Sequence, residues 1–295
     1  MKITRILCPT DFSEASAHAV EQAIALARFY KAGITALHVV PPVEPSLDVL
    51  PVEALREQTA QFFRAAADVD IAVDVVVEVG SAVRHIVDCA GRVSAGLIVM
   101  GTHGASGFEH LVLGSVTERV LRKAPCPVLT VPPRQRPGVH LPFTRLLCAV
   151  DLSAAEPAEV AFAAALAKES GAHLTLLHVL EWPWHEPPAP DLSALPPEQG
   201  VALAAFRRDA EDRARRRLES LVPSHTSVTR EIRSGKPYEQ ILDVAATEHS
   251  DLIVVGVGGR GLIDMALLGS TANHVVRSAT CPVLTLRRTV SARSR

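Results

Sequence analysis

A glycine-rich loop occurs twice in this chain with the same internal spacing. Gly101 and Gly104 are followed, after nine further residues, by Gly114, and the same spacing recurs at 256–259 and 269–270. Each loop comes after a short apolar run and is followed by a helix-like stretch and then Cys-Pro-Val-Leu-Thr. Turn chemistry alone does not fix a nine-residue gap. The repeat therefore predicts two copies of one nucleotide-sized domain.

The match between the two copies extends beyond the loops. Asp11 corresponds to Asp151, which lies 140 positions later, whereas from Gly80 onward the matching positions lie 155 apart. The second copy has therefore gained 15 residues in a Pro-rich stretch between its second and third strands. A Pro-rich linker at 132–142 separates the copies. We expect two domains, at residues 1–133 and 143–289.

Length and composition agree with this division. A chain of 295 residues is long enough for about two domains at ~150 residues each. Apolar residues make up 48% of it and aromatic residues only 4%. Such a balance favours aliphatic α/β packing around a parallel sheet over an aromatic-rich β-sandwich.

Apolar strand-like runs alternate with helical stretches in both copies. Strands are expected near residues 4–9, 35–40, 71–78, 97–101, 127–131, 145–150, 173–179, 226–233, 252–256 and 282–286. Helices are expected near 13–31, 52–67, 81–93, 115–123, 154–170, 198–221, 237–248 and 270–279. Strict alternation implies parallel sheets with right-handed crossovers and helices on both faces. Ligands bind such sheets beyond the carboxyl ends of the strands.

Charge and hydropathy narrow the range of partners. The net charge of −2 lacks the basic excess that a nucleic-acid partner requires. No run approaches 18 apolar residues and the start does not resemble a signal peptide, so we expect a cytoplasmic protein with no membrane partner. The five Cys lack a Cys-x-x-Cys spacing and are interpreted as small buried hydrophobes.

The repeated loops are suited to binding phosphate. Their glycines would let the backbone turn tightly, and Ser115 and Ser270 would begin helices whose free N–H groups favour anions. Asp11 and Asp151 end the first strand of each copy and would face the same crevice. Each carboxylate could hold a ribose hydroxyl or a metal bound to phosphates. The alternative is that the glycines only shape turns, that both Ser are N-caps and that both Asp stabilise helix starts.

The sequence does not indicate a fast enzyme. No Lys follows the last glycine as it does in a Walker A loop, so nothing obvious neutralises a leaving phosphate. Neither a Ser-His-Asp arrangement nor a metal-ligand cluster stands out, and we name no catalytic or metal-ligating residue. His103 could touch phosphate, although its counterpart is Gly258. His38 and His178 are interpreted as core histidines that have hydrogen-bond partners.

These residues resemble the universal stress protein family in its tandem two-domain, ATP-binding form, over nearly the whole chain. The start from Pro9 to Ser16 is typical of the family, as is Gly-Ser-Val-Thr-Glu-Arg-Val-Leu from Gly114. Both copies fit the pattern Gly-x2-Gly-x9-Gly-Ser/Thr of its nucleotide-binding branch. The resemblance implies two Rossmann-like domains of the flavodoxin-like, adenine-nucleotide alpha hydrolase-like type. Each has a five-stranded parallel sheet of order 3-2-1-4-5.

The resemblance also implies a ligand and its contacts. The ligand would be ATP or another adenine nucleotide, with or without Mg²⁺, and Val39 would lie by the adenine. The first site would comprise Pro9, Thr10, Asp11, Val39, Met100, Gly101, Gly104, Gly114, Ser115, Val116 and Thr117. The second would comprise Ala149, Val150, Asp151, Val179, Val255, Gly256, Gly259, Gly269, Ser270, Thr271 and Ala272. The second copy departs from the first at Ala149-Val150 and Ala272, and has Asp251 where the first has Gly96.

Family dimers commonly form through the last strand, so the two copies are expected to pair within one chain as an internal pseudo-dimer. A homodimer of two chains is compatible with this pairing but not required. We expect a protein that acts in stress response or signalling through nucleotide occupancy, with an unknown signalling partner. One alternative is a slow Mg-dependent ATPase. The other is a nucleotide-free protein-interaction module.

Overall fold

The computed structural model describes residues 3–42, 51–103, 113–133, 142–153, 157–181, 196–222, 227–257 and 268–287. The first half contains β1 (Arg5–Thr10), α1 (Glu14–Tyr30), β2 (Gly33–Val40), α2 (Val52–Phe62), a 3₁₀ helix (Arg64–Val69), β3 (Val73–Val79), α3 (Ala82–Arg92), β4 (Leu97–Gly101), α4 (Ser115–Lys123) and β5 (Val128–Val131). The second half contains β6 (Arg145–Ala149), α5 (Ala158–Ser170), β7 (His173–Leu180), α6 (Pro197–Leu221), β8 (Val228–Ser234), α7 (Pro237–Thr247), β9 (Leu252–Val257), α8 (Ser270–Ser278) and β10 (Val283–Arg287). The alternation of strands and helices follows the sequence prediction.

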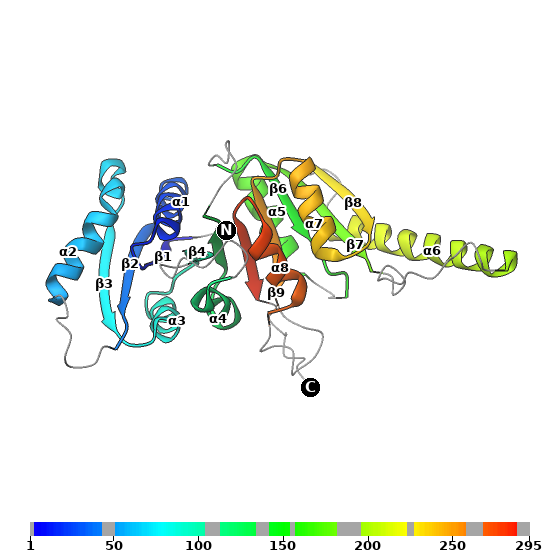
Figure 1. Cartoon of the computed structure of the whole chain (residues 1–295). Coiled ribbons are helices and arrows are strands. Elements are labelled where there is room, and N and C mark those ends of the chain that lie inside the picture. The colour runs from blue at the N-terminus through cyan, green and yellow to red at the C-terminus, as the bar shows by residue number, and fades with distance from the viewer. Residues whose placement is uncertain are drawn as a thin grey trace, which may run out of the picture.

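All the strands belong to a single ten-stranded sheet (Figure 1). Their order is β3-β2-β1-β4-β5-β10-β9-β6-β7-β8. Neighbouring strands are parallel within each half, and β5 and β10 pair antiparallel where the halves meet. Each half thus has the predicted order 3-2-1-4-5. The two predicted sheets are joined edge to edge into one, which makes the molecule an internal pseudo-dimer.

The junction between the halves is a short buried ladder. Leu284 of β10 lies opposite Leu129 of β5, and both side chains are buried. The Thr130 hydroxyl donates to the carbonyl of Val283 at 3.1 Å, and the Thr285 hydroxyl donates to the carbonyl of Val128 at 3.2 Å. Each half therefore covers the exposed sheet edge of the other, an edge that would otherwise present unpaired backbone groups to solvent.

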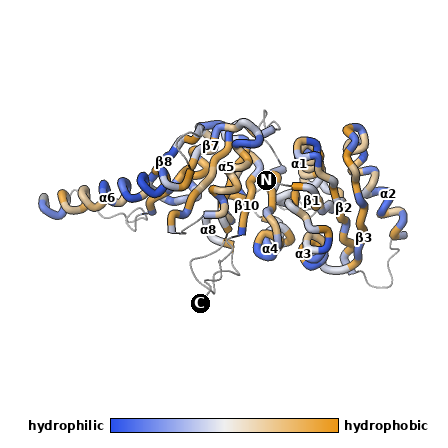
Figure 2. Tube along the Cα trace, turned by 180° about the vertical axis from the view of Figure 1, so that it is seen from behind, coloured by the Kyte–Doolittle hydropathy of each residue, from blue (hydrophilic) through white to orange (hydrophobic). Residues whose placement is uncertain are grey.

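Two layers of helices cover the sheet, and each layer closes a core that runs through both halves. Alternate β1 residues point to opposite faces: Ile6 and Cys8 pack on the α1 side, and Leu7 packs on the α3 and α4 side. The first core continues under α5 in the second half, and the other core continues under α7 and α8. Figure 2 shows hydrophobic residues concentrated along the strands that these layers enclose.

Two helical elements differ from the expected boundaries. The stretch expected as one helix at 52–67 is α2 followed by a 3₁₀ helix. Because residues three apart are eclipsed in a 3₁₀ turn, Phe63 and Ala66 can both point into the core, where they are 2% and 0% exposed. The helix expected at 154–170 begins at Ala158 in the structure, and 154–156 lie outside the described residues.

The helix α6 extends beyond the β8 edge of the sheet (Figures 1 and 2). Its buried side is formed by Ala214 and Leu218 and continues into Val222, the residue that follows the helix. Arg213 forms an ion pair with Asp209 one turn away, and most of the other arginines are exposed. These features are those of a solvated helix face.

The cysteines behave as the composition suggests. Cys8, Cys89, Cys148 and Cys281 are buried, and Cys126 is half-buried. Burial raises the pKa of the Cys126 thiol to about 11, which keeps it protonated near neutral pH. No helix in the described part of the chain combines the length and apolarity needed to cross a membrane.

Candidate functional site

The first site is formed where β1 and β4 end beside one another. The two strands are direct neighbours in the sheet, so Asp11, just after β1, and Gly101, at the end of β4, reach the same edge. The helix α4 begins at Ser115 beside them. These segments surround a cavity of about 250 Å³. This is the edge at which parallel α/β sheets bind ligands.

Residues expected from the sequence line most of this cavity. Its lining consists of Pro9, Thr10, Asp11, Ser16, Leu37, Val39, Ala82, Ile86, Met100, Gly101, His103, Gly114, Ser115, Val116 and Thr117. Of the residues assigned to the first site, Gly104 alone is not placed here, because it lies outside the described residues. The structure thus brings together segments that are about 100 positions apart in the chain.

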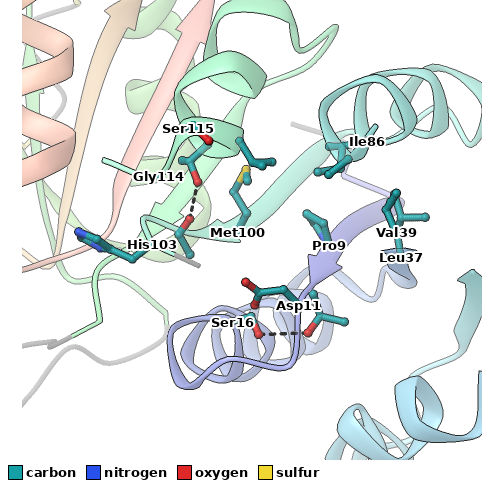
Figure 3. A pocket seen from close by; sticks show the side chains of 15 residues that line it. Pro9, Asp11, Ser16, Leu37, Val39, Ile86, Met100, His103, Gly114 and Ser115 are labelled. Atoms are coloured by element: carbon teal, nitrogen blue, oxygen red, sulfur yellow. Dashed lines mark hydrogen bonds between the residues drawn. The ribbon is translucent and has the colours of Figure 1, made fainter. Parts of the chain in front are cut away.

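The cavity has an apolar end and a polar end (Figure 3). Leu37 and Val39 of β2 lie together with Ile86 of α3 on one side. His103, Gly114 and Ser115 lie on the opposite side, and Asp11 and Ser16 lie between the two ends. A ligand that filled the cavity would therefore meet apolar side chains at one end and a helix N-terminus at the other.

Local hydrogen bonds fix the turn after β1. The Asp11 carboxylate accepts bonds from the Ser13 backbone N–H at 3.1 Å and from the Ser13 hydroxyl at 2.6 Å. The hydroxyls of Thr10 and Ser16 are 3.1 Å apart and both residues are buried. His38 Nδ1 lies 2.9 Å from the Thr10 carbonyl oxygen, so this histidine has a polar partner, as expected. The turn that presents Asp11 is thus held from both sides.

The start of α4 differs from the N-cap alternative. Gly114 is the N-cap residue and Ser115 is the first residue of the helix. The interpretation of Ser115 and Ser270 as N-caps is therefore wrong, since Gly269 likewise caps α8. The Thr117 hydroxyl donates to the Gly101 carbonyl at 2.9 Å and ties the helix start to the end of β4. The first N–H groups of a helix have no partner within it, and at α4 they border the cavity.

Gly101 is required for a reason the sequence did not indicate. A Cβ at this position would come within 2.9 Å of the Ala15 carbonyl oxygen in α1. Such a contact is too short, so the glycine lets α1 pack against the end of β4. The sequence predicts instead that the absence of a side chain lets a ligand approach the backbone. Helix packing is thus sufficient reason for a glycine here, and the approach of a ligand stays a prediction.

The second half has a corresponding, larger cavity of about 540 Å³. It is lined by Ala149, Val150, Asp151, Glu159, Leu177, His178, Val179, Leu180, Glu181, Pro237, Ile241, Val255, Gly256, Gly269, Ser270, Thr271 and Ala272. Every residue assigned to the second site is among them except Gly259, which lies outside the described residues. His178 Nδ1 lies 2.8 Å from the Val150 carbonyl oxygen, which repeats the contact made by His38.

Several lining residues were missed from the sequence. Leu37 lies two positions before Val39 on the same strand and so faces the same side, a signal that strand periodicity offers. Ile86 and its counterpart Ile241 come from helices whose place over the pocket depends on tertiary packing. Glu159 was not anticipated at all. In the described ranges no three His, Cys, Asp or Glu side chains are grouped closely enough to hold a metal ion.

Comparison with known proteins identifies the fold family. The model of the universal stress protein family matches residues 2–132 and 142–287. A universal stress protein of Mycolicibacterium smegmatis is 28% identical over 296 residues, which span 96% of each chain. One from Methanocaldococcus jannaschii is 35% identical over 138 residues, covering 43% of this chain and 81% of that protein.

A solved structure extends the likeness to the whole molecule. The crystal structure of a universal stress protein from Archaeoglobus fulgidus matches with a TM-score of 0.68 and 25% identity, over 98% of this chain and 100% of the other. The repeated loops, the strand order and the paired halves agree with these matches. The chain belongs to the universal stress protein family, with two copies of the family's domain in tandem.

Proposed function

We propose that this protein binds an adenine nucleotide, ATP in the first instance, in the cavity of its first half. The observation that carries the proposal is the two-ended character of that cavity. Leu37, Val39 and Ile86 offer an apolar slot for a flat base, and the N-terminus of α4 offers N–H groups and a positive dipole end to phosphates. Asp11, between the ends, is placed to accept hydrogen bonds from ribose hydroxyls.

The residues available fit such a ligand. The hydroxyls of Ser115 and Thr117 add donors beside the backbone N–H groups of the helix start. The Asp11 carboxylate lies between the apolar end and the helix N-terminus, where ribose hydroxyls rather than phosphates would meet it. Membership of the universal stress protein family supports a role in stress response, which nucleotide occupancy would signal to an unknown partner.

Blocking the apolar end tests the proposal. We expect Val39→Phe to weaken ATP binding at least about tenfold, because the phenylalanine ring fills the slot proposed for the base. Equilibrium dialysis with ATP, ADP, AMP and cyclic AMP, with and without Mg²⁺, measures the effect and the preferred ligand. Val179→Phe at the matching position of the second half is the control and leaves binding in the first cavity unchanged.

Two outcomes would overturn the proposal. The first is that natively purified protein neither carries a nucleotide nor binds one when it is added, which would favour the interaction-module alternative. The second is that Val39→Phe binds ATP as tightly as the wild type, which would place the nucleotide elsewhere. Product analysis of the same samples under single-turnover conditions with Mg²⁺ tests the slow ATPase alternative. Gly104→Val and Gly259→Val would place a side chain in the phosphate path of the first and second site, at positions outside the described residues.

A further inference from the structure

The second cavity contains a buried carboxylate at the end expected to receive phosphate. Glu159 lies in the first turn of α5, is 1% exposed and lines the cavity. A Cβ built on Gly256 would meet its two carboxylate oxygens at 3.0 and 3.1 Å. The carboxylate therefore lies against the end of β9, where the glycine loop of the second half begins.

The first half has no such group at the matching position. The counterpart of Glu159, 140 positions earlier, is Ala19, which is fully buried. There the neighbour of the first loop glycine is the backbone carbonyl of Ala15. The carboxylate is tolerated in the second half because it lies at the N-terminus of α5, where the helix dipole favours negative charge.

The apolar ends of the two cavities are alike, so the difference concerns phosphate. Leu177, Val179 and Ile241 match Leu37, Val39 and Ile86 by position. The two linings differ in charge. Asp11 is the one carboxylate among the described residues that line the first cavity, whereas Asp151, Glu159 and Glu181 line the second. Glu159 is the buried member of that set, and Glu181 is exposed.

A buried negative charge acts strongly on a second one nearby. Water screens exposed charges but cannot reach a group such as Glu159, so repulsion of a phosphate there is much greater than at the surface. Cys148 lies close enough to Glu159 for its pKa to depend on this charge. Burial first, and the charge of Glu159 second, raise the pKa of its thiol well above the usual value.

We propose that Glu159 is a specificity-determining residue that excludes nucleotide phosphates from the second cavity, so that each chain binds one nucleoside triphosphate, in its first half. This inference rests on the proposed nucleotide-binding function of the first cavity. It assigns different roles to the two copies of the repeat. The first responds to nucleotide, and the second keeps the shape of the site without accepting the charged tail.

The test measures ATP binding by equilibrium dialysis at matched protein concentrations. Wild type should bind one equivalent per chain, and Val39→Phe should lose it. In the Val39→Phe background, Glu159→Gln should increase ATP affinity at least about tenfold, because it removes the charge and keeps the size of the side chain. Glu181→Gln makes the same change in charge at an exposed position of the same cavity and should alter affinity less than about twofold.

The outcomes separate the two proposals. Two equivalents bound by wild type, or no gain from Glu159→Gln over Val39→Phe alone, would overturn the role of Glu159. Wild type that binds no nucleotide would instead refute the proposed function of the first cavity, whatever Glu159→Gln does. Circular dichroism checks that each variant is folded. Glu159→Ala is the second variant and should give the same gain if charge is the cause.

Discussion

Asp251 shows how one side chain can anchor a strand of the second half in a way that the first half lacks. Its carboxylate accepts bonds from the Thr144 N–H at 2.7 Å, the Thr144 hydroxyl at 2.8 Å and the Arg145 N–H at 3.0 Å. The residue is 4% exposed. It thereby joins the beginnings of β9 and β6. The matching residue of the first half is Gly96, which has no side chain to accept such bonds.

We expect Asp251→Ala to lower the free energy of unfolding by about 2 kcal/mol, because it removes a buried carboxylate that accepts three part-buried hydrogen bonds from Thr144 and Arg145. Asp251→Asn keeps one carbonyl acceptor and should cost less. Urea unfolding followed by circular dichroism measures both variants. An alanine variant as stable as the wild type would show that these bonds are readily replaced by water.

At the scale of elements, α3 is attached to β3 by a charged cluster centred on Glu78. One carboxylate oxygen accepts a 2.6 Å bond from Arg92 Nη2, and the other contacts His85 Nδ1. Burial alone would raise the pKa of Glu78, but the hydrogen bonds and charges of Arg92 and His85 outweigh it and lower the pKa. In the second half the charges are exchanged: the strand β8 carries the cation, Arg233, and the helix α7 carries the carboxylate, Asp243, at 3.7 Å.

The lowered pKa of Glu78 predicts a pH-dependent contribution to stability. A depressed carboxyl pKa stabilises the fold above the unfolded value, near 4.5, and this stabilisation is lost as pH falls through the folded value. We therefore expect Glu78→Gln to lower the free energy of unfolding by about 1 kcal/mol at neutral pH, after allowance for solvent screening. At a pH below both the folded and the unfolded pKa of Glu78, the substitution should change the free energy of unfolding very little.

Chemical unfolding of wild type and Glu78→Gln across this pH range tests the prediction. Asp88→Asn, which removes an exposed pair with Arg84, is the control and should have a small effect at every pH. A difference between wild type and Glu78→Gln that stays constant down to acid pH would contradict the assignment.

At the scale of the whole molecule, the two halves share their hydrophobic cores and one sheet. Phe143 and Phe162 of the second half line the same small cavity, of about 20 Å³, as Ile3 and Leu97 of the first. The β5–β10 ladder crosses the same region. A contact so continuous implies that the halves unfold together rather than as independent domains.

Leu284→Ala tests this coupling. Removing a buried leucine at the junction should lower the free energy of unfolding by about 2–5 kcal/mol. It should also make the unfolding of the two halves less cooperative. Calorimetry should show a single transition in the wild type and a broader or divided one in the variant. Leu55→Ala, in α2 at the far edge of the first half, is the matched control. Two separate transitions in the wild type would contradict the coupling.

Much of this architecture is determined by local sequence. The duplicated loops, the alternation of apolar runs with helices and the paired Asp11 and Asp151 predict parallel sheets and the edge at which the cavities lie, whereas the strand order came from the resemblance to the family. These features depend on residue type and spacing along the chain, so they can be read without tertiary contacts. The domain boundaries at 1–133 and 143–289 and the roles of the site residues in binding stay predictions.

Tertiary structure alone decided what some of the differences between the two copies do. Glu159 looks like an ordinary acidic residue near a helix start, and only the close packing of α5 on β9 brings it against Gly256. At Gly101 the approach of α1 excludes a side chain, a reason that the spacing of the loop does not indicate. Sequence spacing predicts which residues share an edge of the sheet. Which atom fills the space between them depends on how helices pack across it, and that is set by contacts far apart in the chain.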